Sequence, residues 1–225
     1  MERYLSIIFF TLLFSCSTEE DGQKIVLDKE VINDIGNSIE IPSLDIVSKV
    51  DSIFYQNVFQ MENGQYIAIA EPVNDRFEGL CLQLLEMAYD SSMNVIASSS
   101  YGYDSRTYFP TFFKQGKRTF LLVNTGERDS WGNKVMELTN KEFKEFGFID
   151  VAKATRNRPG EDHEFRHENI ARFSILSDNE PLTLTFTCDS IILFDDQKSA
   201  LDTLLSSDQV KYVLKEGQLA LETKY

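Results

Sequence analysis

The feature that most constrains the fold is a long series of short β-type segments separated by turn residues. Leu182–Phe194 (LTLTFTCDSIILF) begins by alternating threonine with apolar residues, which is typical of a strand with one buried face. Gln65–Ala70 follows Asn63-Gly64, a dipeptide that favours a tight hairpin. Further strands are expected at Ile25–Leu27, Ser38–Ile41, Ser52–Val58, Leu80–Tyr89, Val95–Ser99, Arg118–Asn124, Lys134–Leu138, Phe146–Val151, Phe173–Leu176, Val210–Leu214 and Leu219–Thr223.

This spacing predicts a mostly β fold, an antiparallel meander that forms a sandwich, a barrel or a small propeller-like array. Helical patterns are limited to Glu161–Arg172 and Lys198–Ser206, so we expect one or two short helices. The 225 residues suit one domain and are enough to bury a sizeable core.

Charge restricts the partners. The chain carries 22 Lys and Arg against 36 Asp and Glu, a formal net charge of −14. Because nucleic-acid binding needs clustered cations to neutralise phosphates, we expect no nucleic-acid partner. Aromatic residues at 12% of the chain argue against intrinsic disorder.

The N-terminus has the pattern of an export signal. Met1–Arg3 carries one cation, and Tyr4–Phe14 is an almost unbroken apolar run that ends in Ser15-Cys16. This run is shorter than the roughly 20 residues that a membrane-spanning helix needs, but it suits the apolar part of a signal peptide. An ordinary signal peptide or a buried N-terminal helix are the alternatives.

Leu13, Ser15 and Cys16 together resemble the lipobox of bacterial outer-membrane lipoproteins. The resemblance implies cleavage before Cys16 and a lipid anchor, such as palmitate, on that cysteine. Ser17–Gly22 (STEEDG) resembles the Bacteroidota-type surface export signal, which implies an outer-membrane protein facing the cell exterior. An acidic spacer without a sorting role, and hence the periplasmic face, is the alternative.

These observations divide the chain into three parts. Residues 1–15 are expected to be a lipoprotein signal peptide, residues 16–23 the lipidated cysteine with its acidic tether, and residues 24–225 a single β-rich globular domain. The membrane is then a partner through the lipid anchor alone. Cys81 and Cys188 remain in apolar runs, where they either form a disulfide or stay as two buried free thiols.

His163-Glu164-Phe165-Arg166-His167 matches the HExxH pattern and contains both histidines of the chain. On a helix the two imidazoles would share one face and bind one zinc ion, with Glu164 as the catalytic general base. In these three residues the segment resembles the zincin metalloproteases, which implies a zinc-dependent hydrolase. The charged neighbours favour instead a solvated helix without metal, so we expect no cofactor, with Zn as the alternative.

Aromatic side chains supply the other candidate site. The segment 101–113 holds six aromatic residues, and the single tryptophan, Trp131, lies in a polar loop. Tyr101, Tyr103 and Trp131 stand beside polar residues, an arrangement that favours glycan, peptide or protein binding, while core packing of these rings is the alternative. We therefore expect a lipid-anchored envelope or cell-surface binding protein of unknown ligand. A zinc-dependent hydrolase that uses the HEFRH segment and a structural subunit of an envelope complex are the alternatives.

Overall fold

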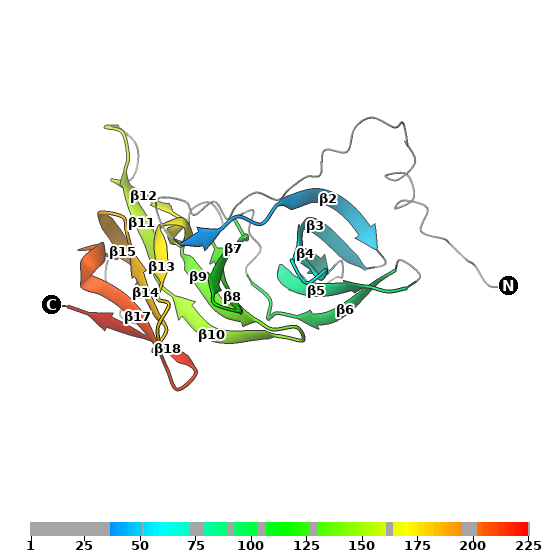
Figure 1. Ribbon diagram of the computed structural model, residues 1–225. Helices are drawn as coiled ribbons and strands as arrows, with labels where there is room; N and C mark the ends of the chain where they lie inside the picture. The colour runs from blue at the N-terminus through cyan, green and yellow to red at the C-terminus, as the bar shows by residue number, and fades with distance from the viewer. Residues whose placement is uncertain are drawn as a thin grey trace, which may run out of the picture.

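A computed structural model of the full chain describes residues 37–50, 52–72, 79–89, 92–102, 107–126, 130–160, 164–194 and 202–224, with the side chains of 44–50 excepted. The expected signal peptide, Cys16, the acidic tether and the expected strand Ile25–Leu27 lie outside these residues. The described chain is mostly antiparallel β-strand, as the sequence predicts (Figure 1).

Four open sheets make up this part of the molecule, and two of them have five strands each. The N-terminal sheet has the order β2-β3-β4-β5-β6, and the middle sheet has the order β1-β7-β8-β9-β10. Their strands are β1 (Ser38–Ile39), β2 (Ser43–Val50), β3 (Ile53–Gln60), β4 (Tyr66–Pro72), β5 (Cys81–Met87), β6 (Met93–Ser98), β7 (Pro110–Gln115), β8 (Arg118–Thr125), β9 (Gly132–Leu138) and β10 (Phe143–Ile149).

The other two sheets have four strands each. The third sheet has the order β12-β11-β15-β16, and the fourth has the order β13-β14-β17-β18. Their strands are β11 (Val151–Arg156), β12 (Phe165–Glu168), β13 (Ser174–Leu176), β14 (Thr183–Phe186), β15 (Ser190–Leu193), β16 (Thr203–Ser206), β17 (Val210–Lys215) and β18 (Gln218–Thr223). The chain passes from the middle sheet into the third sheet at Asp150, the residue between β10 and β11.

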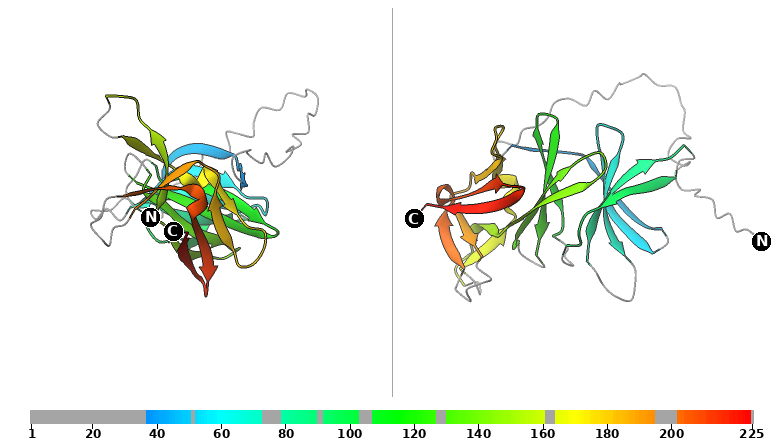
Figure 2. Two further views of the ribbon diagram at one scale, coloured as in Figure 1. Left: turned by 90° about the vertical axis from the view of Figure 1, so that its left-hand side faces the viewer. Right: turned by 90° about the horizontal axis from the view of Figure 1, so that it is seen from below.

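The middle sheet lies between two hydrophobic cores. Along β8, Phe120 and Leu122 enter the core shared with the third and fourth sheets, whereas Leu121 and Val123 enter the core shared with the N-terminal sheet. Alternate residues of a strand point to opposite faces, so the uninterrupted apolar run of β8 is the pattern of a strand buried on both sides. Figure 2 shows the green middle sheet between the other sheets. The arrangement is sandwich-like, since the sheets are stacked and do not close.

The N-terminal sheet bends because its strand pairing is interrupted. The register shifts in the β2–β3, β3–β4 and β5–β6 pairs. Each bulge adds a residue to one strand and increases the local twist, so the sheet curls around its core.

Both predicted helices are wrong where the structure describes them. Phe165–Glu168 is strand β12, paired antiparallel with β11, and only Ile170–Phe173 forms a turn of 3₁₀ helix, η2. Thr203–Ser206 is strand β16, paired with β15. Short polar segments carry a weak helical preference, and pairing with an adjacent strand outweighs it.

Candidate functional site

A pocket of about 630 Å³ opens between the middle and third sheets. Its volume is within the range of small-molecule sites in proteins. The described residues that line it are mostly aromatic or charged, together with one threonine: Thr125, Trp131, Lys134, Phe148, Asp150, His167, Phe194 and Asp202.

One wall of the pocket is a row of three residues at the end of the third sheet. Leu193 pairs with Val151 on one side and with Thr203 on the other. The next position in this register places Phe194 between Asp150 and Asp202. The Phe194 amide donates to the Asp150 carbonyl at 2.9 Å, which continues the ladder. Residues directly opposite each other project from the same face, and two strand spacings separate the Cα atoms of the two aspartates by about 10 Å. Two carboxylates therefore flank one aromatic ring.

His167 joins this wall from the far side of β11. It pairs with Ala154 on β11, and its ring meets that of Phe194 edge to face, with centroids 5.2 Å apart. His167 belongs to β12 and Phe194 directly follows β15, and these two strands lie on either side of β11. Ala152 and Ala154 are the β11 residues on this face, and their small side chains leave room for the rings to meet.

Other lining residues come from the middle sheet, where Gly132 is the residue that allows close packing. Its φ of +137° is unfavourable for other residues, and a Cβ atom there would lie 2.2 Å from the Ile149 carbonyl oxygen and 2.8 Å from the Phe148 ring. Phe148 can therefore pack directly over this backbone. The neighbouring Trp131 donates its amide to the Thr125 carbonyl at 2.9 Å, and 42% of Trp131 stays exposed.

Ser130, the residue before Trp131, is bonded to the third sheet. The Ser130 amide donates to the His167 carbonyl at 3.1 Å, and the Ser130 hydroxyl donates to Asn124 Oδ1 at 2.5 Å. Ser130 and Asn124 are both buried. These buried hydrogen bonds fix the backbone next to Trp131 against the third sheet and β8.

Lys134 lines the pocket, and its ammonium group is hydrogen-bonded to the chain that follows β6. Lys134 Nζ donates to the Ser100 hydroxyl and, at 2.7 Å, to the Tyr101 carbonyl. The amide and hydroxyl of Ser100 in turn donate to the Glu145 carboxylate. Burial lowers the pKa of Lys134 from its ordinary value, an effect that the negative charge of Glu145 opposes.

The structure brings two of the predicted site residues together and leaves a third at the margin. Trp131 and His167 line the same pocket, although the sequence assigned them to different hypotheses. Tyr101 is 44% exposed and is connected to the pocket through its carbonyl bond to Lys134. Tyr103 and His163 lie outside the described residues.

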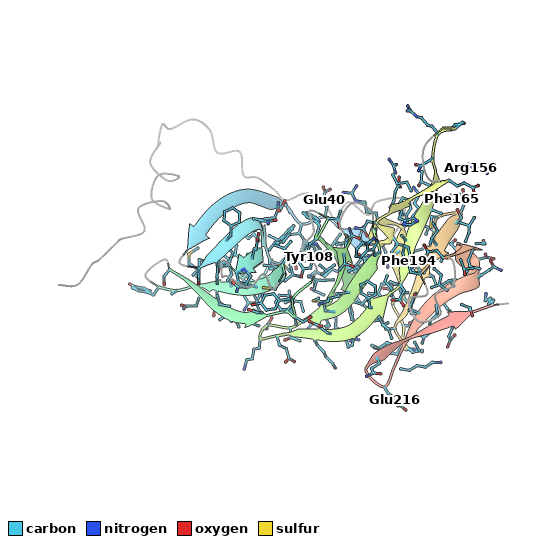
Figure 3. The ribbon with its side chains drawn as sticks, turned by 180° about the vertical axis from the view of Figure 1, so that it is seen from behind. Glu40, Tyr108, Arg156, Phe165, Phe194 and Glu216 are labelled. Carbon is cyan, nitrogen blue, oxygen red and sulfur yellow. The ribbon has the colours of Figure 1, made fainter. Side chains whose placement is uncertain are left out.

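The helical geometry behind the zinc hypothesis is absent at Glu164 and His167. His167 is in β12, and the Asn157 amide donates to the Glu164 carbonyl, so the β11–β12 ladder extends to Glu164. Residues three apart on an extended chain project from opposite faces, so the carboxylate is directed away from the His167 ring. It pairs instead with Arg156 at 3.0 Å and is mostly exposed. Figure 3 shows Arg156 and Phe165 farther out along this hairpin than Phe194.

The two remaining cysteines are free thiols. Cys81 begins β5 of the N-terminal sheet, whereas Cys188 belongs to the core on the other side of the middle sheet. Burial raises the pKa of both thiols, that of Cys81 to about 11. The second expectation from the sequence, two buried free thiols, is the one that the structure contains.

Sequence reasoning missed most of the pocket because its residues are distant along the chain. Lys134, Phe148, Asp150, Phe194 and Asp202 come from four strand ends, and strand pairing alone brings them together. Asp150 carried a detectable signal, since it is a single charge inside the apolar run 146–151.

Comparison of the chain with protein-family models, curated proteins and solved structures found no match. Among the described residues, none of the helices is long and apolar enough to cross a membrane. The same residues contain no group of three or more His, Cys, Asp or Glu side chains arranged to hold a metal ion.

Proposed function

We propose that the protein is a lipid-anchored binding protein of the bacterial envelope that captures a ligand in the Trp131 pocket. The observation that carries this proposal is a single pocket that is lined by the partly exposed rings of Trp131 and Phe148 and by two aspartates, Asp150 and Asp202. Ligand sites generally combine apolar walls with a few fixed polar groups, and tryptophan offers a large contact surface at little entropic cost.

The proposed location rests on the N-terminal sequence. Leu13, Ser15 and Cys16 resemble a lipobox, and Glu19, Glu20 and Asp21 resemble a surface export signal. Several acyl chains on Cys16 would anchor the chain stably, since each buried methylene contributes about 0.8 kcal/mol. An acidic domain would be repelled by an anionic lipid surface, which favours display away from the membrane. We propose the outer membrane, exterior face, with the periplasmic face as the alternative.

A binding assay with a matched aromatic control tests the function. Trp131→Ala is expected to abolish a ligand signal on glycan and peptide arrays while the melting temperature stays within a few degrees of the parent. Tyr89→Ala is the control, because Tyr89 is fully exposed and lies outside the pocket. Equal loss in both variants, or no loss in Trp131→Ala, would contradict the proposal.

The location is tested separately. Cys16→Ala is expected to abolish labelling by a palmitate analogue, and persistent labelling would contradict the lipobox assignment. Neutral replacement of Glu19, Glu20 and Asp21 is expected to reduce protease accessibility on whole cells. Unchanged accessibility would favour a spacer without a sorting role.

A further inference from the structure

The edge strand β6 carries exposed apolar side chains. It is the last strand of the N-terminal sheet, and β5 is its one partner among the described strands (Figure 1). Met87 of β5 lies opposite Met93 of β6. Leu85 lies opposite Val95, two residues farther along each strand, so all four side chains project from one face of the hairpin. Leu85 is buried, whereas 42% of Met87, 37% of Met93 and 47% of Val95 are exposed, and contiguous apolar side chains of this kind mark interaction surfaces.

The edge of β6 also lacks charge. Its sequence, MNVIAS, contains no charged residue and no proline. Native proteins usually place charges, prolines or bulges along exposed edges, which prevents strand pairing between molecules. The other edge strands of six or more residues in the described sheets all carry charged residues: Asp45 and Lys49 in β2, Lys144 and Glu145 in β10, and Glu222 in β18. Of these four edges, β6 is therefore the one at which two copies of an acidic chain could meet without charges on the paired strands.

Hydrogen bonding within the hairpin determines which backbone groups of β6 face outward. The Ala88 amide donates to the Ser92 carbonyl at 2.8 Å, so these two residues form a hydrogen-bonded pair. Hydrogen-bonded and non-hydrogen-bonded pairs alternate along an antiparallel ladder. Asn94 therefore bonds to β5, while the amides and carbonyls of Met93 and Val95 point away from it.

The outward-facing groups are symmetric about Asn94, which favours a second copy of the chain as the partner. A bulge at Ile96 ends the regular part of the edge, so Met93–Val95 is the part available for pairing. When a two-fold axis passes through Asn94, Met93 lies opposite Val95 of the second copy, and Val95 lies opposite Met93 of the second copy. Each of these two pairs can form two hydrogen bonds, and the apolar stripes of both hairpins become continuous.

We propose that the protein forms a two-fold symmetric dimer in which the β6 edges of two copies pair antiparallel, centred on Asn94. The net charge of −14 on each chain opposes association, but the opposition is limited at this surface. Glu86 is the carboxylate next to the axis in this register, since it pairs with Asn94 on β5. Three strand spacings would separate the two Glu86 Cα atoms by about 14 Å, which is longer than the Debye length of about 8 Å at physiological salt.

The dimer goes beyond the proposed function and does not depend on it. None of the described residues that line the Trp131 pocket belongs to the β5–β6 hairpin. Ligand capture and dimerisation can therefore be tested, and can fail, separately.

Sedimentation velocity of the mature chain with Cys16→Ala measures the association. About six residues would pair on each side, whereas a standard interface has roughly 20–30, so we expect a weak dimer with a Kd of about 10–100 µM. Added salt should tighten the dimer, because it screens the repulsion between two acidic chains. Val95→Lys should weaken it about tenfold or more, since an edge lysine blocks strand pairing. Leu204→Lys is the matched control, because Leu204 is 48% exposed on the edge strand β16, and it should leave the Kd unchanged.

A cysteine at the two-fold axis tests the register. Asn94 and its copy would form a non-hydrogen-bonded pair with Cα atoms about 4.5 Å apart, a separation that a disulfide can bridge. Asn94→Cys should therefore cross-link the dimer on mild oxidation, whereas Leu204→Cys should not. Cys81 and Cys188 are buried and should take no part in the reaction.

Three results would overturn the inference: a monomer at about 500 µM, well above the expected Kd, an unchanged Kd in Val95→Lys, or cross-linking of Asn94→Cys no faster than that of Leu204→Cys. Misfolding is excluded as the cause of a weaker dimer when Val95→Lys keeps the melting temperature of the parent, as expected for an exposed position. A monomer that still binds an array ligand through Trp131 would overturn the dimer and leave the binding function intact.

Discussion

The strongest structural prediction concerns two adjacent leucines of β8 that belong to different cores. Leu121 packs toward the N-terminal sheet and Leu122 toward the third and fourth sheets, and neither is exposed to solvent. Truncation of either to alanine removes three buried carbons, worth about 0.8 kcal/mol each. The residual cavity adds about 24 cal/mol per Å³, so we expect each variant to lose about 3–5 kcal/mol of unfolding free energy.

Urea unfolding, followed by circular dichroism, measures these losses. Leu204→Ala is the control, because Leu204 is 48% exposed on the edge strand β16 and should cost less than about 0.5 kcal/mol. A double-mutant cycle tests the separation of the cores. Met136 is the cross-strand neighbour of Leu121 and shares its core, so this pair should couple by 0.5 kcal/mol or more.

A large loss of unfolding free energy for one leucine and a small loss for the other would contradict the placement of the two leucines in separate buried cores. A loss below about 1 kcal/mol for Leu121→Ala would mean that the middle sheet is buried on one face only. Strong coupling of Met136 to Leu122 in place of Leu121 would place both leucines in one core, contrary to their alternation along β8.

Three further predictions concern buried polar groups and ionisable side chains. Asn133 is fully buried, and neither polar atom of its side chain has a hydrogen-bond partner among the described residues. Asn133→Leu should therefore raise the free energy of unfolding by about 1–3 kcal/mol. A lower free energy of unfolding in urea would contradict this. Cys81 and Cys188 are buried, and their thiol pKa values are raised. In the Cys16→Ala chain a thiol reagent at pH 8 should therefore label neither cysteine in the folded protein and both cysteines after unfolding. Rapid labelling of the folded protein would disprove the burial. Hydrogen bonds from Lys211 and Lys215 lower the pKa of Glu222 to about 2 from an ordinary 4.5, so the stability contributed by this carboxylate is present above pH 4.5 and is lost as pH falls toward 2. Glu222→Gln should therefore reduce the free energy of unfolding at pH 6 but not at pH 2. An equal difference at both pH values would contradict this assignment.

Sequence patterns predicted the fold class because strand periodicity and turn residues are local signals. The apolar run of β8 and the hairpin dipeptide Asn63-Gly64 each identify an element without tertiary information. The segment Phe165–Glu168 was misassigned because its polar residues have little preference of their own, and pairing with β11 decides their conformation.

The pocket was less predictable, for a physical reason. Trp131 could be singled out as a tryptophan in a polar loop, but its neighbours Phe194 and Asp202 reach it only through the register of the third sheet. The role of Ala152 and Ala154 is also invisible in the sequence. Their small side chains leave space above β11, in which the rings of His167 and Phe194 meet.

Trp131 emission provides the most direct test of ligand capture. A ligand found on an array should cause a saturable change in this emission, with a midpoint equal to the Kd measured by calorimetry on the same protein. Because Trp131 is the single tryptophan and lines the pocket, such agreement locates binding there. Calorimetric binding without any change in Trp131 emission would contradict ligand capture in this pocket, since the ligand would then bind elsewhere on the molecule.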